Sequence, residues 1–198
     1  MDLWNYEREY SDNGYSIICG VDEAGRGPLA GPVCAAAVIL PFGIDIPGLN
    51  DSKKLTEAKR NALYDVITGC AVSYGISMVF QDEIDEINIL NATFKAMNEA
   101  ISKLDLKPEI ALIDGNRSTS IRYNNACIVG GDGKSASIAA ASILAKVTRD
   151  RYMYEISEKY PEYCFDKHKG YGTKLHYEKI REFGPCELHR KTFLKKLH

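Results

Sequence analysis

Short apolar runs along the chain alternate with longer stretches in which apolar residues recur at helical spacing. Runs that are apolar on both faces, or that alternate loosely, predict strands at 15–21, 33–40, 71–80, 110–113 and 125–129. Polar and glycine-rich segments separate these runs, as expected of the turns that connect strands to other elements.

The clearest helical pattern covers residues 82–104. Its apolar positions follow one another at intervals of three or four: Ile84, Ile87, Leu90, Phe94, Met97, Ile101 and Leu104. Further helices are predicted at 56–67, 135–160, 173–183 and 190–197, with Thr56 as a start signal for the first. Residues 50–54 are predicted as a polar loop, and residues 1–16 give no assignment. Alternating strands and helices indicate an α/β fold with a mixed central sheet.

Length and composition are those of an ordinary globular protein. The chain has 198 residues, 45% of them hydrophobic and 26% charged, which excludes disordered and fibrous classes. This length predicts a single domain spanning residues 1–198. The net charge of −2 argues at first against a nucleic-acid partner.

The distribution of charge removes that argument. Residues 1–145 carry 12 Lys and Arg against 19 Asp and Glu, whereas residues 146–198 carry 13 against 8 and all four histidines. We therefore expect an acidic core at about 1–145 and a basic helical C-terminal part at about 146–198. The basic part would follow a nucleic-acid backbone.

The sequence predicts neither export nor membrane insertion. The start of the chain has no apolar run, and the longest uncharged run, 27–44, contains three prolines and is shorter than the roughly 20 residues of a membrane-spanning helix. None of the six cysteines forms a C-x-x-C pair, and Cys19, Cys34 and Cys127 lie in apolar runs. We expect a cytoplasmic protein with reduced, buried thiols.

Three local patterns are similar to known site motifs, but each lacks a structural feature that its motif requires. The glycines at 25 and 27 with Ala30 fit a dinucleotide fingerprint, but a strand from 33 leaves no room for the required helix. A P-loop ending at Gly133 would need a glycine five positions earlier, where Ile128 stands. Ser142 and Lys146 have the spacing of a serine–lysine hydrolase without an oxyanion loop.

Carboxylates stand at the ends of three predicted strands. Asp22 and Glu23 end the first, Asp114 ends a second, and Asp132 follows a third. Neighbouring residues of a strand face opposite sides, so a turn or bulge would be needed for both Asp22 and Glu23 to converge. Clustered carboxylates suit magnesium or manganese, and two such ions serve phosphodiester hydrolysis. The alternative is that these acids only terminate strands in water.

Several long motifs resemble the type 2 ribonuclease H family, ribonuclease HII. The similarity runs from about residue 17 to the end of the chain and is carried by residues 20–33, 49–55, 113–115, 131–132, 139–151, 168–173 and 183–193. The resemblance implies a ribonuclease H-like fold with a mixed central sheet and a helical C-terminal part. It also implies cleavage of the RNA strand of RNA–DNA hybrids and cleavage 5′ to ribonucleotides embedded in duplex DNA.

The resemblance further implies roles for individual residues. It implies that the protein is a monomer. It also implies that two Mn²⁺ or Mg²⁺ ions are bound in the active complex. The catalytic and metal-binding residues would be Asp22, Glu23, Asp114 and Asp132. The substrate-binding residues would be Gly25, Arg26, Gly27, Lys53 and Tyr171, with Lys146 and Asp150 in supporting roles.

Simpler interpretations stay open for most of these residues. Gly25–Gly27 could be only a tight turn, and Lys53 only part of a solvated helix start. Lys146, Arg149 and Asp150, one helical turn apart, could form an internal salt-bridge face. The rival to the enzyme is a nucleic-acid-binding module whose carboxylates are structural.

Overall fold

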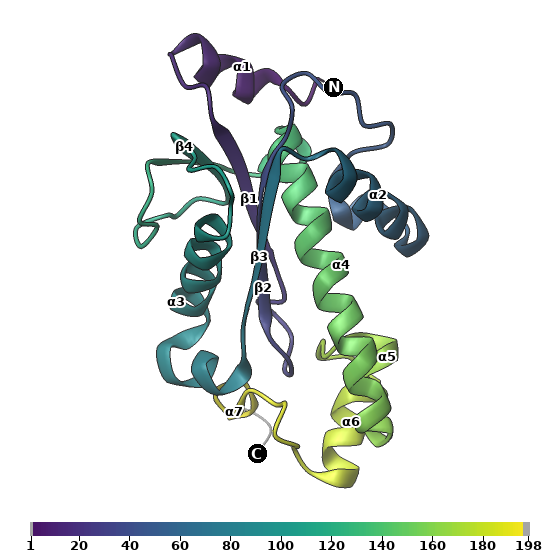
Figure 1. Cartoon of the computed structure of the whole chain (residues 1–198). Helices are drawn as coiled ribbons and strands as arrows, with labels where there is room; N and C mark the ends of the chain where they lie inside the picture. The colour runs from purple at the N-terminus through teal and green to yellow at the C-terminus, as the bar shows by residue number, and fades with distance from the viewer. Residues whose placement is uncertain (1, 196–198) are drawn as a thin grey trace.

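A computed structural model describes residues 2–195 and contains one five-stranded sheet (Figure 1). Its strands are β1 (Ile18–Ala24), β2 (Val33–Ile39), β3 (Ser73–Val79), β4 (Ile110–Asp114) and β5 (Asn125–Ile128), in the order β3-β2-β1-β4-β5. β1 pairs antiparallel with β2 and parallel with β4, and β5 continues the parallel half. The predicted α/β class with a mixed sheet is confirmed.

The helices follow the predicted order with a few additions. They are α1 (Asn5–Asp12), α2 (Glu57–Cys70), α3 (Gln81–Ser102), α4 (Ala136–Lys159), α5 (Phe165–His168), α6 (Lys174–Phe183) and α7 (Lys191–Leu194). Three short 3-10 helices are η1 (Ser52–Lys54), η2 (Gly131–Gly133) and η3 (Pro161–Tyr163).

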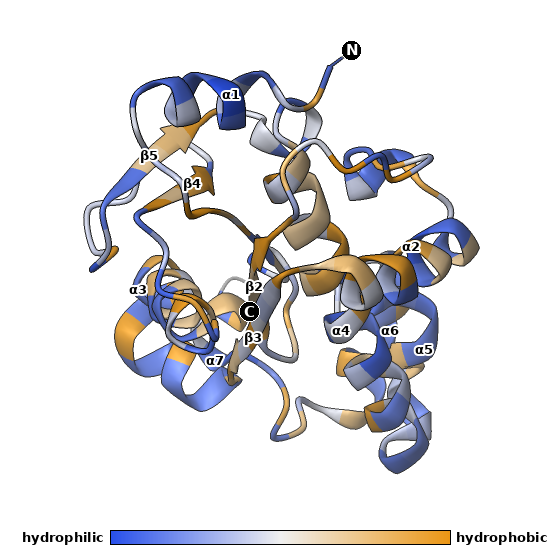
Figure 2. Ribbon diagram, turned by 45° about the horizontal axis from the view of Figure 1, so that its top comes forward, coloured by the Kyte–Doolittle hydropathy of each residue, from blue (hydrophilic) through white to orange (hydrophobic). Residues whose placement is uncertain are grey.

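The sheet is covered on both faces. α3 packs on one face and α4 on the other, with α2 outside α4 (Figure 1). Val21 and Ala35 belong to the core on the α3 side, whereas Cys34 and Ala36 belong to the core on the α4 side. Hydrophobic colouring accordingly concentrates on the strands and the inner part of α4, while α1, α5 and α6 are largely hydrophilic (Figure 2).

The backbone of α4 lies unusually close to β1. A Cβ atom at Gly20 of β1 would stand 2.1 Å from the carbonyl carbon of Ser137 in α4. The alanine-rich first half of α4, which includes Ala139, Ala140 and Ala141, is fully buried at this contact. Small residues on both elements thus let the helix lie against the strand that carries the first carboxylates.

β1 lies three residues later in the sequence than predicted. It was expected to end at 21, but it begins at Ile18 and continues to Ala24, which pairs with Cys34 of β2. Asp22 and Glu23 therefore lie inside a regular strand, opposite Ala36 and Ala35. The polar residues stay in the strand because the antiparallel ladder with β2 extends past the apolar run.

α3 is interrupted where the periodicity predicted one continuous helix. Asn88 adopts φ 66° and ψ 163°, outside the helical region. Its side-chain oxygen accepts hydrogen bonds from the N–H groups of Leu90 and Asn91, at 3.0 and 3.1 Å. Asn88 thus caps a second helical segment, and the apolar spacing continues across the kink.

The N-terminal helix α1 had no sequence signal and docks through a buried acid. One oxygen of Glu7 accepts hydrogen bonds from the hydroxyls of Ser135 and Ser137 and from the N–H of Ser137. The carboxylate therefore caps the start of α4, where the helix dipole favours negative charge. The C-terminal helix predicted at 190–197 is shorter, Lys191–Leu194, and residues 196–198 lie outside the described part of the chain.

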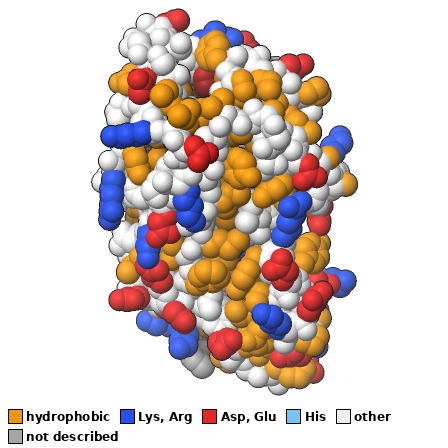
Figure 3. Space-filling view, in the orientation of Figure 1, with side chains coloured by type: hydrophobic (Ala, Val, Ile, Leu, Met, Phe, Trp, Pro, Cys, Tyr) orange, Lys and Arg blue, Asp and Glu red, His pale blue; other side chains and the backbone are white. Residues whose placement is uncertain are grey.

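The structure also bears on the predictions about cysteines, membrane-spanning helices and the charge boundary. All six cysteines are free, and Cys19 and Cys34 are buried, but Cys127 is exposed on the edge strand β5. No helix within residues 2–195 is both long and apolar enough to cross a membrane. The charge boundary near residue 145 falls inside α4, so it divides composition and not secondary structure. On the face shown in Figure 3, acidic and basic side chains are interspersed with apolar ones.

Candidate active site

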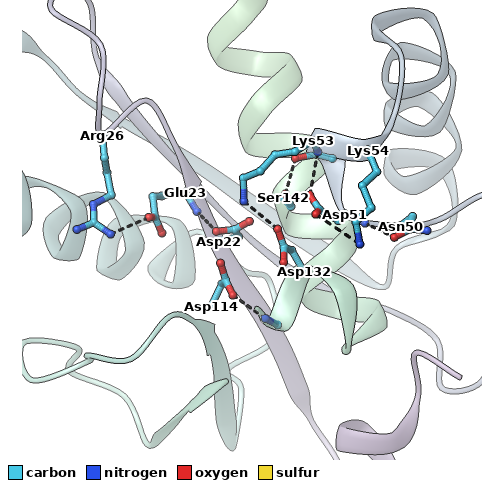
Figure 4. A network of polar contacts seen from close by, with 12 residues as sticks. Asp22, Glu23, Arg26, Asn50, Asp51, Lys53, Lys54, Asp114, Asp132 and Ser142 are labelled. Atoms are coloured by element: carbon cyan, nitrogen blue, oxygen red, sulfur yellow. Dashed lines mark hydrogen bonds and ion pairs between the residues drawn. The ribbon is translucent and has the colours of Figure 1, made fainter. Parts of the chain in front are cut away.

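Three aspartates meet at one edge of the parallel half of the sheet (Figure 4). Asp22 lies in β1, Asp114 ends β4, and Asp132 lies in η2, just after β5. Each offers a carboxylate oxygen, and these oxygens all lie within 4.8 Å of one another. The predicted convergence of these three strand-end carboxylates is confirmed.

The register of the strands explains the meeting. Val21 pairs with Ile113, so the next residues, Asp22 and Asp114, are neighbours on the α4 side of the sheet. One oxygen of Asp114 accepts a hydrogen bond of 2.7 Å from the N–H of Gly131. That bond fixes the start of η2 and with it the position of Asp132.

Burial, and to a lesser extent the neighbouring carboxylates, raises the pKa values of Asp22 and Asp114. Burial raises the pKa of Asp22 well above its ordinary value, and the charges of Glu23 and Asp114 add to this effect. The pKa of Asp114 is also raised, mainly by burial, although the N–H of Gly131 opposes the shift. Such groups hold a negative charge at neutral pH most easily when a cation is bound between them.

Glu23 faces the other side of the sheet and stands apart from the three aspartates. The turn or bulge that convergence of Asp22 and Glu23 would need is not formed, because β1 continues as a regular strand to Ala24 and sends neighbouring side chains in opposite directions. Glu23 accepts a hydrogen bond of 3.2 Å from Arg26 (Figure 4). Burial raises the pKa of Glu23 although Arg26 opposes the shift. Both residues, with Asp114 and Arg117, line a hollow of about 240 Å³ beside the aspartates.

Lys53 reaches the aspartates from η1. Its ammonium group lies 3.0 Å from an oxygen of Asp132, while 76% of its side chain is exposed. Partial burial lowers the pKa of Lys53, but the hydrogen bond to Asp132 and the charge of that residue outweigh this, and the pKa is raised. The side chain of Asp51 accepts a hydrogen bond from the backbone N–H of Lys53, at 2.9 Å, which shapes the turn.

Lys146 and Asp150 form the salt bridge of the simpler interpretation, but Arg149 does not take part and donates to backbone carbonyls instead. The side chains of Lys146 and Asp150 pair at 2.7 Å on successive turns of α4. The hydroxyl of Ser142 instead lies 2.7 Å from that of Ser52. Because Lys146 is paired with an acid and Ser142 with another serine, the serine–lysine hydrolase is excluded.

Tyr171 and the Gly25–Gly27 segment lie on adjoining loops. The N–H of Leu29 donates to the carbonyl of Gly170, at 2.8 Å, which joins the two loops. The ring of Tyr171 is 40% exposed, with the cations of Lys146 and Arg149 at 5.6 and 5.7 Å from its centroid. β2 follows the Gly25 loop without an intervening helix, so the dinucleotide fingerprint is excluded.

Sequence reasoning did not predict that two arginines in this region are buried. Arg149 and Arg190 are both fully buried, and both donate hydrogen bonds to backbone carbonyls of residues 25–32. Arg190 lies in the basic tail, where composition favours solvent exposure. A sequence signal for its burial is lacking because the carbonyls it binds lie about 160 residues earlier in the chain.

Comparison with known proteins agrees with the metal-binding geometry of the three aspartates. The profile of a protein family described as Ribonuclease HII matches residues 19–198. The chain belongs to the ribonuclease HII family. A ribonuclease HII of Caldicellulosiruptor bescii is 55% identical over 99% of this chain and 95% of its own length. One from Acetivibrio thermocellus is 55% identical over 98% of this chain and 76% of its own length.

Solved structures share the fold. The ribonuclease H2 of Pyrococcus horikoshii matches with a TM-score of 0.73 and 27% identity, covering 89% of this chain and 93% of that one. The ribonuclease HII of Archaeoglobus fulgidus, solved in complex with PCNA, matches with a TM-score of 0.76 and 26% identity over 91% and 95% of the two chains. These matches confirm the ribonuclease H-like fold.

Membership of the ribonuclease HII family makes the chain a metal-dependent endoribonuclease that acts on RNA–DNA hybrids. The P-loop nucleotidase is excluded, because Gly131–Gly133 forms a 3-10 helix with Asp132 at its centre and Ile128 ends β5. The resemblance seen in the motifs is therefore confirmed across nearly the whole chain.

Proposed function

We infer that this protein cleaves the RNA strand of hybrids and also cuts 5′ to single ribonucleotides in duplex DNA, with two divalent ions, Mn²⁺ or Mg²⁺. The observation that carries this inference is the convergence of Asp22, Asp114 and Asp132 within 4.8 Å. Glu23, one residue along β1, would complete the ligand set from the other side of the sheet edge.

The donor set fits a hard divalent cation. All of the converging atoms are carboxylate oxygens, which Mg²⁺ and Mn²⁺ prefer. Burial and the neighbouring carboxylates raise the pKa values of Asp22 and Asp114, and a bound cation would oppose that effect. A manganese complex is known for the Bst-RNase HIII structure, whose fold is similar to that of this chain.

The reaction is hydrolysis of a phosphodiester. Divalent ions held by Asp22, Asp114 and Asp132 would supply an activated water and stabilise the departing oxygen. The oxygen of the water would lose a proton and form a bond to phosphorus while the bond from phosphorus to the 3′ oxygen breaks, and the 3′ oxygen would take up a proton. The products carry a 5′-phosphate and a 3′-hydroxyl, and the carboxylates of Asp22 and Asp114 keep the reacting groups in place.

Substrate recognition would come from the adjoining loops. Gly25 is buried against Arg149, whereas the exposed Gly27, where a Cβ would meet nothing within 4 Å, would let a nucleotide approach the backbone. Tyr171 offers a half-exposed ring for stacking on a sugar. Lys53 would contact a phosphate near the scissile bond. Lys146 and Asp150 would act in support, by fixing the side of α4 that faces Tyr171.

The wider context is part of the same proposal. The basic part of the chain, about 146–198, would follow the duplex backbone, so affinity should fall as salt rises. We propose that the protein acts as a monomer in the cytoplasm on hybrids and on duplex DNA with embedded ribonucleotides.

A labelled DNA duplex with one ribonucleotide tests the proposal. Cleavage in Mn²⁺ that leaves a 5′-phosphate and stops with chelator is the expected result. Tight binding without cleavage in Mn²⁺ or Mg²⁺ would instead support the nucleic-acid-binding module. A matched all-DNA duplex should stay intact under the same conditions.

A further inference from the structure

Two buried guanidinium groups lie directly under the loop that contains Gly25–Gly27. Arg149 and Arg190 are both fully buried, and within residues 2–195 neither forms an ion pair. Burial lowers the pKa of Arg149 and lowers that of Arg190 to about 9. Burying a charge without a counter-ion is unfavourable, so the hydrogen bonds of these two guanidinium groups must offset the cost of their burial.

The guanidinium of Arg190 binds both ends of the loop. It donates to the carbonyls of Gly25 at 2.6 Å and Arg26 at 2.9 Å on one side. On the other side it donates twice to the carbonyl of Gly31, at 2.8 and 3.0 Å. The backbone N–H of Arg190 also donates to the carbonyl of Leu29, at 2.8 Å. One side chain thus closes residues 25–31 into a fixed ring.

Arg149 holds the same loop from α4. It donates to the carbonyls of Pro32 at 2.9 Å and Ala30 at 3.2 Å, and to that of Lys169 at 3.0 Å. A Cβ atom at Gly25, where φ is +95°, would lie 2.1 Å from its Nε. Gly25 therefore lies between the two arginines, and no other residue fits there.

These bonds determine which way the peptide groups of the loop point. All described peptide bonds are trans, so the C=O and N–H of one peptide point in opposite directions. The carbonyls of Gly25 and Arg26 face Arg190, so the N–H groups of Arg26 and Gly27 face away from it. Within the described part of the chain, neither of these amides has a hydrogen-bond partner.

A guanidinium group can enforce this polarity because it carries only donors. If either peptide flipped, its N–H would face the N–H groups of Arg190, and a carbonyl would point outward. A lysine would keep the charge but could not reach Gly25, Arg26 and Gly31 together, because its donors share one atom.

We propose that Arg190 is a positioning residue for ribonucleotide selectivity. By holding the carbonyls of Gly25 and Arg26 inward, it presents the N–H groups of Arg26 and Gly27 as two outward donors for the 2′-hydroxyl oxygen of the substrate. This inference rests on the proposed role of the Gly25–Gly27 loop. Arg190 itself touches neither the substrate nor the three aspartates.

Binding without cleavage tests the proposal. Arg190→Lys and the control Arg181→Lys, an exposed arginine of α6, are compared with wild type in chelator. The measured quantity is the ratio of dissociation constants for an all-DNA duplex and the same duplex with one ribonucleotide. Loss of one well-placed hydrogen bond changes affinity roughly fivefold to tenfold. We expect Arg190→Lys to lower the ratio by about that factor, with affinity for all-DNA unchanged.

Other outcomes have distinct meanings. An equal loss of affinity for both duplexes, or an unchanged ratio, overturns the role of Arg190 while the cleavage activity of wild type stands. The same holds if wild type cleaves at the ribonucleotide but binds both duplexes equally in chelator. Failure of wild type to cleave either a hybrid or the single ribonucleotide in Mn²⁺ would contradict the proposed function instead.

A measurement on wild type keeps the proposal testable if Arg190→Lys does not fold. The amide hydrogens of Arg26 and Gly27 should exchange quickly with solvent in the free protein. They should become protected when the duplex with one ribonucleotide is added in chelator, and not when the all-DNA duplex is added. Amides already protected in the free protein would show that the peptides point inward, against the proposal.

Discussion

The imidazole Nε2 of His176 lies 3.1 Å from the Nε2 of His189, with both rings buried. His176 must carry its proton on Nδ1, because that atom lies 2.9 Å from the carbonyl of Tyr171. His189 then donates from Nε2, and its Nδ1 accepts the N–H of Cys186 at 3.0 Å. This chain of hydrogen bonds requires both rings to be neutral, since a second proton would set two N–H groups against each other.

The neutral pair predicts a loss of stability in mild acid. Burial lowers the pKa of each ring to about 4 from an ordinary value near 6.5, and for His176 the charge of His168 adds to the effect. Between those pH values the unfolded chain binds protons that the folded protein excludes, so the free energy of unfolding falls as pH falls. We expect a decrease of about 2 kcal/mol or more between pH 7 and pH 5.

Denaturant unfolding at several pH values measures this effect. The raised pKa values of Asp22 and Asp114 act in the opposite direction, so wild type is compared with the double variant His176→Gln, His189→Gln. The double variant should show a weaker decrease. An identical pH dependence in both proteins would contradict neutral histidines.

The approach of α4 to β1 predicts a large effect of one methyl group. Gly20→Ala would place its Cβ 2.1 Å from the backbone of Ser137, and neither the helix nor the strand can shift without breaking the sheet. We expect destabilisation of about 3 kcal/mol or more by denaturant unfolding. Gly69→Ala is the matched control, because a Cβ at this exposed position of α2 meets nothing within 4 Å. It should be neutral or stabilising by about 0.5–1 kcal/mol.

The sequence predicted the sheet and the three clustered aspartates, Asp22, Asp114 and Asp132, because those features are local. An apolar run followed by an acid specifies both a strand and the residue at its end, as for Asp114. The sequence could not predict which face of the sheet the side chain of Glu23 points to. That direction depends on how far the ladder of hydrogen bonds between β1 and β2 extends. The burial of Arg190 depends on carbonyls distant in sequence, and α1 depends on the docking of Glu7 at the start of α4.

Asp114→Asn should lower the rate of cleavage without weakening the binding of duplex. The amide oxygen can still accept the N–H of Gly131, so η2 should keep its place while a metal ligand loses its charge. Loss of one group that stabilises charge in a transition state typically costs roughly 100- to 1000-fold in rate, which we expect for cleavage. Duplex binding should stay within about twofold, because phosphate contacts elsewhere set the affinity.

The same variant should be more stable in chelator. The pKa of Asp114 is raised in the folded protein, so its charge is unfavourable there at pH 7 and its removal relieves repulsion. A higher thermal midpoint than that of wild type is expected, with Glu158→Gln on the exposed side of α4 as control. Wild-type cleavage by Asp114→Asn would contradict its place in the site.

Lys53→Met should strengthen the binding of metal and lower the cleavage of substrate. Its ammonium lies 3.0 Å from Asp132, so its removal makes the site more negative. We expect Mn²⁺, followed by its paramagnetic resonance signal, to bind about threefold to tenfold more tightly, a modest gain because the lysine is largely exposed. Cleavage should fall if Lys53 contacts phosphate. Lys54→Met, whose partner Asp51 lies 3.9 Å away, should change neither quantity.

Tyr171→Ala tests whether the exposed ring senses the ribose. The ring centroid lies 5.6 and 5.7 Å from the cations of Lys146 and Arg149. The carbonyl of Tyr171 lies 2.9 Å from Nδ1 of His176, so the loop should keep its shape without the ring. Stacking on a nucleotide is worth about 1–3 kcal/mol, which predicts a roughly tenfold or greater loss of cleavage at a single ribonucleotide. Binding of all-DNA duplex should change little.

Tyr154→Ala is the matched control, because this tyrosine of α4 is exposed to the same degree and also lies under a cation, Lys169 at 3.8 Å. It lies outside the two adjoining loops and should leave the ratio of cleavage to DNA binding unchanged. If Tyr171→Ala lowers cleavage and all-DNA binding equally, the ring serves general docking and not recognition of the sugar. A larger loss in cleavage than in binding assigns the ring to the ribonucleotide itself.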